Sequence, residues 1–201
     1  MIAIETILAA LPQTQCTQCG FEGCAPYAAS IVAGESDINR CPPGGAEGVA
    51  LLSRITGIAI KPIAAECGAT KPRHIAVIDP ARCIGCTLCI VACPVDAIIG
   101  APKAMHQVIS AACTGCDLCL PPCPVDCIDM VRIDGLLDWT TDDARAARVA
   151  HEVRLTRLAV SATIAPPEAE APAALDKNTV QSAISSALAK ARARRVNGAH
   201  S

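Results

Sequence analysis

The sequence Cys83-Ile-Gly-Cys86-Thr-Leu-Cys89-Ile-Val-Ala-Cys93-Pro94 spaces four cysteines as C-x2-C-x2-C-x3-C, followed by a proline. The same spacing returns 30 residues later in Cys113-Thr-Gly-Cys116-Asp-Leu-Cys119-Leu-Pro-Pro-Cys123-Pro124. Where a chain carries two such runs, three cysteines of each run bind one [4Fe–4S] cluster, and the fourth binds the cluster of the other run. The two runs therefore predict two clusters with crossed ligands.

The crossed arrangement assigns eight cysteines. We expect one cluster to be bound by Cys83, Cys86, Cys89 and Cys123. We expect the other to be bound by Cys113, Cys116, Cys119 and Cys93. Zinc ribbons also contain C-x2-C pairs, but a tetrahedral zinc site takes two pairs, and the third cysteine of each run would then have no role. Iron–sulfur clusters are therefore favoured over zinc in this segment.

The segments around the two runs predict the fold of this repeat. Short apolar stretches rich in β-branched residues lie at Ile75–Ile78 before the first run, at Ile98–Ile99 after it and at Met130–Val131 after the second. Such stretches favour strands. We therefore expect each half to contain a strand, a cluster loop, a short helix and a return strand, and the two halves to be related by a pseudo-twofold axis.

A separate set of four cysteines precedes the repeat, at Cys16, Cys19, Cys24 and Cys41. Gly20 and Gly23 allow the backbone to turn tightly around an inorganic group. Four thiolates suit a third [4Fe–4S] cluster, but they could also bind zinc, so the residues alone leave both open. Residues 1–12, 26–31 and 46–56 are expected to form short helices around this set.

Composition limits the classes of function. The chain of 201 residues has 14 Cys but only one Phe, one Tyr and one Trp. Its start has neither a basic segment nor a cleavage motif, so we expect no export and a reducing compartment, where clustered thiols act as metal ligands. No apolar stretch reaches the roughly 20 residues of a membrane span. Residues 1–140 carry 13 acidic and 8 basic side chains, which disfavours nucleic acid as a partner.

The organisation follows from these patterns. The sequence predicts an α+β protein with a cluster domain at 1–56, a linker at 57–73, a two-cluster domain at 74–139 and a tail at 140–201. In the tail we expect a helix over 142–160, a disordered Ala/Pro/Glu-rich linker, and a second helical segment over 176–195. The arginines at positions 145, 148, 154 and 157 are expected to form a solvated basic face, with docking to an acidic partner as the alternative.

Several residues near the motifs have no assigned ligand role. Cys127 takes the place of Ala97 in the repeat, so we expect a small buried residue beside a cluster. Cys67 is interpreted as an ordinary thiol and His106 as a surface or packing residue. Asp96 and Asp126 are expected to cap the turns after the prolines. No nucleophile–base pair or dinucleotide motif is present in the sequence, so we expect no substrate site.

The N-terminal motif carries a family resemblance. The segments Cys16-Thr-Gln-Cys19-Gly20 and Cys41-Pro-Pro-Gly-Gly45, followed by the two cysteine runs, resemble the B subunit of the Rnf (Rsx) electron transport complex over residues 1 to about 135. The resemblance implies a four-Fe–S domain followed by a bacterial-type two-cluster ferredoxin domain. It implies that Cys16, Cys19, Cys24 and Cys41 bind a [4Fe–4S] cluster, which makes three clusters in the chain.

The resemblance also implies a function. Members pass electrons between a soluble donor and membrane subunits that couple this transfer to ion movement. We therefore expect an electron carrier without its own substrate site, in the cytoplasm or peripherally attached to the cytoplasmic face of the inner membrane, with redox proteins as partners. One alternative is a free-standing soluble ferredoxin that serves a cytosolic reductase. Another is a zinc- or iron-dependent regulatory protein whose tail contacts partners.

Overall fold

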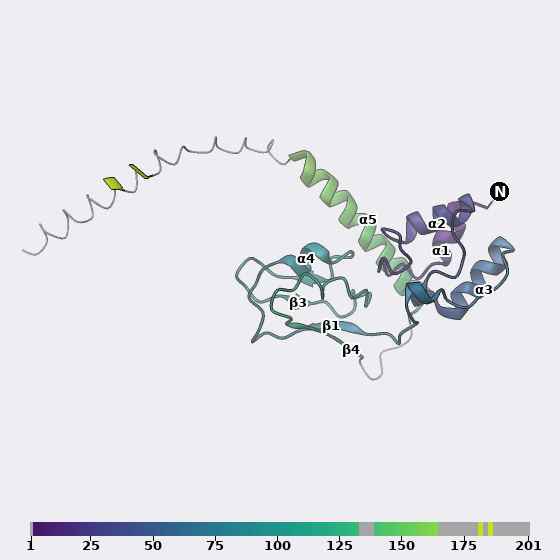
Figure 1. Cartoon of the computed structure of the whole chain (residues 1–201), viewed down its shortest axis with the longest axis horizontal. Coiled ribbons are helices and arrows are strands. Elements are labelled where there is room, and N and C mark those ends of the chain that lie inside the picture. The colour runs from purple at the N-terminus through teal and green to yellow at the C-terminus, as the bar shows by residue number, and fades with distance from the viewer. Residues whose placement is uncertain (1, 133–138, 165–180, 183–184, 187–201) are drawn as a thin grey trace, which may run out of the picture. The chain divides into compact units, whose positions relative to one another are not determined.

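The computed structural model describes residues 2–132, 139–164, 181–182 and 185–186 of the chain. Residues Met1–Leu158 form one compact unit, and Ala159–Ser201 form a second. The first unit combines helices with two short two-stranded sheets (Figure 1), so the predicted α+β class is confirmed. The domain boundaries predicted at residues 56, 73 and 139 stay predictions.

Three helices build the N-terminal part of the first unit: α1 (Ile4–Ala10), α2 (Cys24–Ala33) and α3 (Gly45–Thr56). They surround an apolar core in which Ile7, Tyr27 and Leu52 are almost fully buried. Helix α2 ends at Gly34 (φ 73°) and α3 at Gly57 (φ 75°), both in the left-handed conformation that glycine adopts without a steric penalty. The three helices predicted here are confirmed. The short 3-10 helices η1 (Pro42–Gly44) and η2 (Ala65–Cys67) accompany them.

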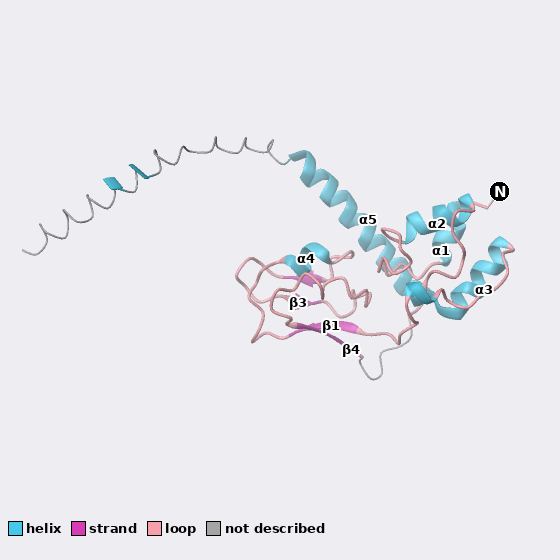
Figure 2. Ribbon diagram, viewed as in Figure 1, coloured by secondary structure: helices cyan, strands magenta, loops and turns pink. Residues whose placement is uncertain are grey.

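Four strands frame the cysteine repeat: β1 (Ile75–Ile78), β2 (Ile98–Ile99), β3 (Gln107–Val108) and β4 (Ile128–Val131). Strand β1 pairs antiparallel with β4, with Ile75 opposite Val131, and β2 pairs antiparallel with β3, with Ile98 opposite Val108. The outer strands of the repeat thus pair with each other, and so do the inner ones (Figure 2). This pairing is what a pseudo-twofold repeat requires. Strands β1, β2 and β4 were predicted, and β3 was not.

The two halves of the repeat differ after their third cysteine. In the first half the chain forms the helix α4 (Leu88–Ala92), whereas the corresponding residues 118–122 form turns. Pro121 and Pro122 stand where the first half has Val91 and Ala92. A proline has no amide hydrogen and restricts the residue before it, so the helix cannot form there. The short helix predicted for the second half was therefore wrong.

Helix α5 (Thr141–Ile164) starts at a capping box. The Thr140 hydroxyl accepts a hydrogen bond from the Asp143 amide (3.1 Å), and the Asp143 carboxylate accepts one from the Thr140 amide (2.9 Å). Ala147 is buried in the core of the repeat, so the first part of this helix belongs to the first unit. The helix predicted over 142–160 is confirmed. The disordered linker predicted over 161–175 was wrong at its start, because residues 161–164 belong to α5. The rest of the linker and the second predicted helix lie outside the described residues, except 181–182 and 185–186, which are helical.

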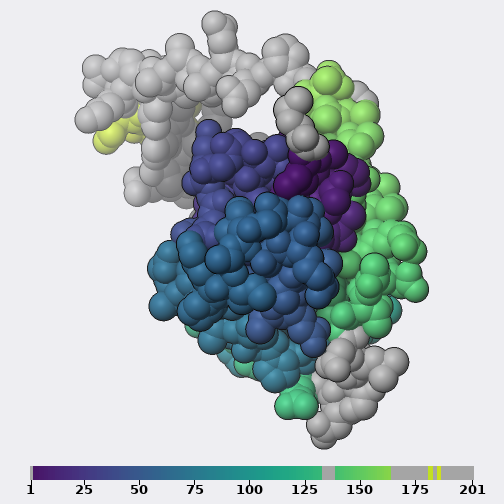
Figure 3. Space-filling model, turned by 90° about the vertical axis from the view of Figure 1, so that its right-hand side faces the viewer, coloured from purple at the N-terminus to yellow at the C-terminus, as the bar shows by residue number. Residues whose placement is uncertain are grey.

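Helix α5 also contacts the N-terminal residues. The Trp139 indole N–H donates a hydrogen bond to the Pro12 carbonyl (2.8 Å), and Arg148 forms an ion pair with Glu5. In the space-filling view the purple N-terminal residues lie beside the green residues of α5 (Figure 3). Arg154 is only 8% exposed, so the solvated basic face predicted for this helix was wrong at that position. None of the helices within the described residues combines the length and apolar character of a membrane span.

Candidate metal centres

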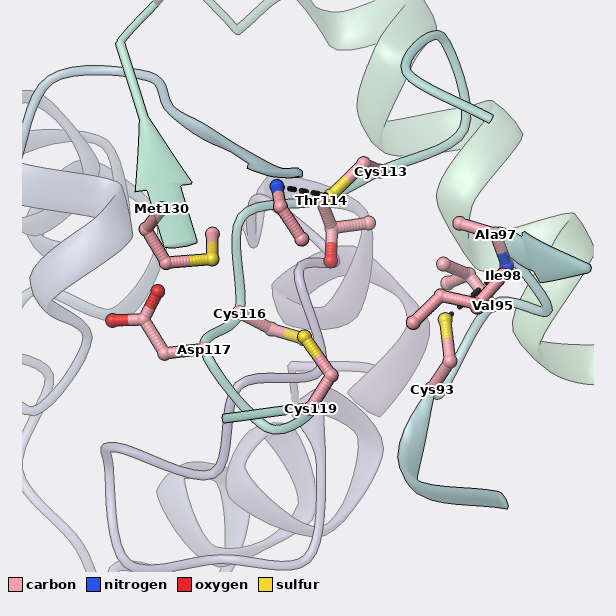
Figure 4. Close-up of a pocket in the computed structure, with 11 residues that line it drawn as sticks. Cys93, Val95, Ala97, Ile98, Cys113, Thr114, Cys116, Asp117, Cys119 and Met130 are labelled. Atoms are coloured by element: carbon pink, nitrogen blue, oxygen red, sulfur yellow. Dashed lines mark hydrogen bonds between the residues drawn. The ribbon is translucent and has the colours of Figure 1, made fainter. Parts of the chain in front are cut away.

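Two cavities lie within the repeat, and cysteines of both runs line each of them. Cavity A is lined by Cys83, Cys86, Cys89, Cys123 and Cys127 together with His106 and apolar residues. Cavity B, shown in Figure 4, is lined by Cys93, Cys113, Cys116 and Cys119 together with Thr114, Asp117 and apolar residues. Their empty volumes are similar, about 260 Å³ and about 320 Å³. Each cavity thus brings together three cysteines of one run and the fourth cysteine of the other, which are the sets that the crossed assignment names.

The first two cysteines of each run are separated by a glycine that the fold requires. Gly85 has φ 70° and Gly115 has φ 65°, a conformation that costs other residues about 1–2 kcal/mol. A Cβ atom on Gly85 would lie 2.6 Å from the backbone nitrogen of Ala104, and one on Gly115 would lie 2.6 Å from the carbonyl oxygen of His74. Each cysteine loop therefore packs directly against a neighbouring backbone segment.

The fourth cysteine of each run accepts a backbone hydrogen bond in the same way. The Ala97 amide donates to Cys93 Sγ (3.2 Å; Figure 4), and the Cys127 amide donates to Cys123 Sγ (3.4 Å). A hydrogen bond from an amide stabilises the thiolate over the thiol. In a cluster, such bonds also influence the reduction potential.

Burial acts against ionisation of Cys89, Cys116 and Cys119, whose pKa values it raises. It raises the pKa of Cys116 to about 11 and the pKa of Cys119 to about 12. Burial also opposes ionisation of Cys123, but the amides of Cys127 and Val125 outweigh it and lower the pKa of Cys123. Without bound positive charge, Cys116 and Cys119 hold their protons at neutral pH. Binding of a cationic group there would therefore release protons.

Two residues of cavity A had no assigned role in the sequence. His106 is 2% exposed, its Nδ1 lies 3.3 Å from Cys89 Sγ, and its Nε2 has no hydrogen-bond partner within the described part of the chain. Cys127 is 3% exposed, and its sulfur lies 3.5 Å from Cys123 Sγ. The predicted burial of Cys127 is confirmed. No local sequence pattern predicted the contact between His106 and Cys89, because it depends on how the connection between β2 and β3 folds over the first cysteine run.

The N-terminal cysteines lie in the loop before α2, at its first residue and just before η1. Cys16, Cys19 and Cys24 are buried and Cys41 is half-buried. Cys19 and Cys24 lie in the same apolar core, and Cys41 packs against it. Burial raises the pKa of Cys24 to about 11, and the charges of Cys16 and Cys19 contribute to this rise. Burial likewise raises the pKa of Cys41, with contributions from the same three cysteines.

Polar residues hold the N-terminal loop in place. The Gln15 side-chain oxygen accepts a hydrogen bond from the Cys24 amide (2.9 Å), and the Arg40 Nε donates to the Cys19 carbonyl (3.1 Å). Cys67, which was interpreted as an ordinary linker thiol, is 5% exposed and lies close enough to Cys19 to affect its pKa. All four predicted ligands and one further thiol therefore gather in this part of the molecule.

The donor sets fit the predicted group. Four cysteine thiolates are the ligands of a [4Fe–4S] cluster, and in cavities A and B four of them surround an empty space. In the described residues, no three His, Cys, Asp or Glu side chains converge as ligands of a single metal ion.

Comparison with known proteins points in the same direction. Residues 76–130 match the family model "4Fe-4S dicluster domain", and residues 11–43 match the model "Putative Fe-S cluster". No solved structure matches the chain.

Curated relatives of the chain include B subunits of an ion-translocating oxidoreductase complex. The relative from Alkalilimnicola ehrlichii is 58% identical over 137 residues, which cover 67% of this chain and 74% of that protein. The relatives from an Azoarcus species and from Thiobacillus denitrificans are 60% and 62% identical over 106 residues, 53% of this chain. The chain spans only 58% and 56% of the lengths of these two. Because the chain is 58% identical to a B subunit over 74% of that protein's length, and has twelve cysteines in the predicted spacing, it belongs to the family of B subunits of ion-translocating oxidoreductase complexes.

Proposed function

We propose that this chain is an electron-transfer protein that carries three [4Fe–4S] clusters and serves as the B subunit of an ion-translocating oxidoreductase complex. The observation that carries the proposal is the lining of cavities A and B, where cysteines of both runs lie around each empty space. The names of the relatives and the two family matches support the same function.

The residues of the chain have defined tasks in this function. The crossed cysteine sets bind two clusters, and Cys16, Cys19, Cys24 and Cys41 bind the third. Backbone amides at Ala97 and Cys127 donate hydrogen bonds to ligand sulfurs, and the buried apolar lining excludes water. A bound [4Fe–4S] cluster supplies the ability to take up and release one electron.

A buried hydrogen bond supports an order of transfer. The Thr114 hydroxyl, in the loop of cavity B, donates to the Thr14 carbonyl (3.0 Å), two residues before Cys16. Cavity B is therefore linked directly to the N-terminal cysteine set, and it shares its two cysteine runs with cavity A. Electrons would pass between the N-terminal set and cavity A by way of cavity B.

The cluster count has a direct test in the anaerobically purified full chain. Three clusters predict about twelve irons and twelve acid-labile sulfides per chain. The Cys16→Ala variant should contain about four irons fewer and keep the spectra of the two repeat clusters. Zinc without sulfide would contradict the proposal at any of the three sites.

The place in a membrane complex needs a separate test. A chain with this role should co-purify with membranes in low salt and dissociate in high salt, because its acidic first part would bind basic surfaces of its partners. Recovery of the chain free of membranes at every salt concentration, together with a soluble reductase, would instead identify the free-standing ferredoxin that the sequence left as the alternative.

A further inference from the structure

Cavity A contains one cysteine more than a cluster needs. Five thiols line it, those of Cys83, Cys86, Cys89, Cys123 and Cys127, whereas four line cavity B. The fifth thiol is in contact with one of the four predicted ligands, since the sulfurs of Cys123 and Cys127 are 3.5 Å apart. Its side chain is 3% exposed, so it faces the cavity and not the solvent.

The position of Cys127 is well defined by its backbone. Its amide donates to Cys123 Sγ (3.4 Å), and its carbonyl accepts a hydrogen bond from the Asp79 amide (2.8 Å). The next residue, Ile128, begins β4 and pairs with Ile78 of β1. Cys127 is therefore held at the edge of cavity A independently of the Cys123 side chain.

The pseudo-twofold repeat supplies a natural comparison. Around cavity B the same backbone arrangement occurs, with the Ala97 amide donating to Cys93 Sγ (3.2 Å). The side chain at this position is the methyl group of Ala97, so no second thiol is available to replace Cys93. At this position the two halves of the repeat thus differ by one atom, the sulfur of Cys127.

We infer that Cys127 is a substitute ligand of the cavity A cluster, able to bind the iron that Cys123 normally binds. The inference rests on the proposed function, because it requires a cluster in cavity A. If the iron lost its bond to Cys123, Cys127 Sγ would bind that iron instead, and the Cys127 thiol would give its proton to the released Cys123 thiolate, or to solvent in a variant that lacks Cys123. No oxidation or reduction is involved. Rotation of the Cys127 side chain between rotamers moves the sulfur by about 3 Å, so a small shift of the cluster or of the loop would have to supply the rest of the 3.5 Å between the two sulfurs.

The test compares cysteine-to-alanine variants of the full chain, reconstituted anaerobically with iron and sulfide. The Cys123→Ala variant should keep the wild-type iron and sulfide content, with altered visible and electron-spin spectra because the ligand geometry has changed. The double variant Cys123→Ala/Cys127→Ala should contain between about one and about four irons fewer than the wild type, because one iron of its cubane has no cysteine ligand and is released more easily.

Matched controls come from the other half of the repeat. The Cys93→Ala variant should lose iron as the double variant does, because Ala97 offers no sulfur. Adding a thiol at that place, in Cys93→Ala/Ala97→Cys, should restore the iron content. The Cys127→Ala variant alone should keep the full content, since Cys123 is the normal ligand.

The outcomes separate the inference from the proposed function. If wild-type protein contains the expected iron and sulfide but Cys123→Ala loses as much as the double variant, the substitute-ligand role is overturned and the clusters stand. If Cys127→Ala alone loses the cavity A cluster, Cys127 is a regular ligand and the inference is also overturned. If the wild type itself holds no iron and sulfide, the proposed function fails first.

Discussion

In cavity A, His106 and a fifth cysteine lie close to the sulfurs of predicted ligands, whereas the lining of cavity B includes Thr114, Asp117 and Met130. The backbone around the two cavities nonetheless shares three features. Each loop contains a glycine in the left-handed conformation, each fourth cysteine accepts an amide hydrogen bond, and each is followed three residues later by an aspartate with positive φ.

If both cavities hold clusters, this difference would let one motif produce two unlike redox centres. The cysteine spacing determines the backbone around each site, while neighbouring segments supply the hydrogen bonds and charges close to the sulfurs. Those groups tune the potential of a cluster, so two clusters with the same type of ligands need not have the same potential. Unequal potentials would give electron transfer between them a preferred direction.

The shared backbone predicts equal and large effects at its glycines. Gly85→Ala and Gly115→Ala should each destabilise the loaded protein by about 3 kcal/mol, because the added methyl combines an unfavourable φ with a backbone clash. The measurement is the urea concentration at which the visible cluster absorbance is lost. Gly48→Ala is the control, since Gly48 lies within α3 and a Cβ there would meet nothing within 4 Å. A large destabilisation by only one of the two substitutions would show that the two halves of the repeat are not equivalent.

A smaller and unequal effect is expected at the two aspartates after the prolines. Asp96, expected to cap a turn, instead forms ion pairs with Arg154 and Arg157 of α5, and no ion pair between described residues involves Asp126. Asp96→Asn should cost about 1–2 kcal/mol because it weakens the pairing of the buried Arg154. Asp126→Asn should cost less than about 0.5 kcal/mol. Asparagine is used because it tolerates the positive φ of both positions.

The pH for this comparison follows from the pKa of Asp96. Partial burial opposes its ionisation, but hydrogen bonds from Arg157 and Arg154 outweigh burial and lower the pKa below the ordinary 3.8. The contribution of Asp96 is therefore fully present above the unfolded-state pKa, and it is lost only as the pH falls through the lower folded-state value. Unfolding of Asp96→Asn and Asp126→Asn should be measured near pH 7. Equal losses of stability in the two variants would contradict the predicted difference between the two aspartates.

His106 should affect the potential more than the stability. An iron-bound thiolate only accepts hydrogen bonds, so Nδ1 of His106 would donate to Cys89 Sγ. Because such a bond favours the more negative, reduced cluster, His106→Leu should lower the potential of the cavity A cluster by on the order of 40 mV for a loss of about 1 kcal/mol. Redox titration followed by electron-spin spectra measures this shift. His74→Leu is the control, since His74 binds Asp117 and not a sulfur. An unchanged potential in His106→Leu would show that the hydrogen bond from His106 does not tune the cluster of cavity A.

The smallest effect is expected from the second compact unit. Deletion of residues 159–201 should leave the iron content and the unfolding midpoint of both cavities unchanged, because the first unit ends at Leu158. Deletion of 141–201 should lower the midpoint, since it removes Ala147 from the core of the repeat and both arginine partners of Asp96. Equal behaviour of the two truncations would show that α5 does not stabilise the repeat.

Much of the candidate site could be predicted because cysteine ligand spacing is a local property. A cluster loop needs its first three thiols within a few residues, so C-x2-C-x2-C can be recognised without knowledge of the fold. Helices α1 and α3 were predicted from apolar spacing, and α2 was predicted with Gly34 as its end. The helix expected in the second half was wrong because Pro121 and Pro122 prevent it, although the cysteine spacing of the first half is repeated there.

The surroundings of the cysteines had no such local signal. The contact of His106 with Cys89 joins residues 17 apart, the pairing of Arg154 with Asp96 joins residues 58 apart, and the Thr114–Thr14 hydrogen bond joins residues 100 apart. Which side chains meet across such separations depends on how helices and strands pack, and no short pattern encodes that packing. The spacing of the cysteines was therefore enough to predict the ligands. The groups that distinguish one cavity from the other could be identified only from the tertiary structure.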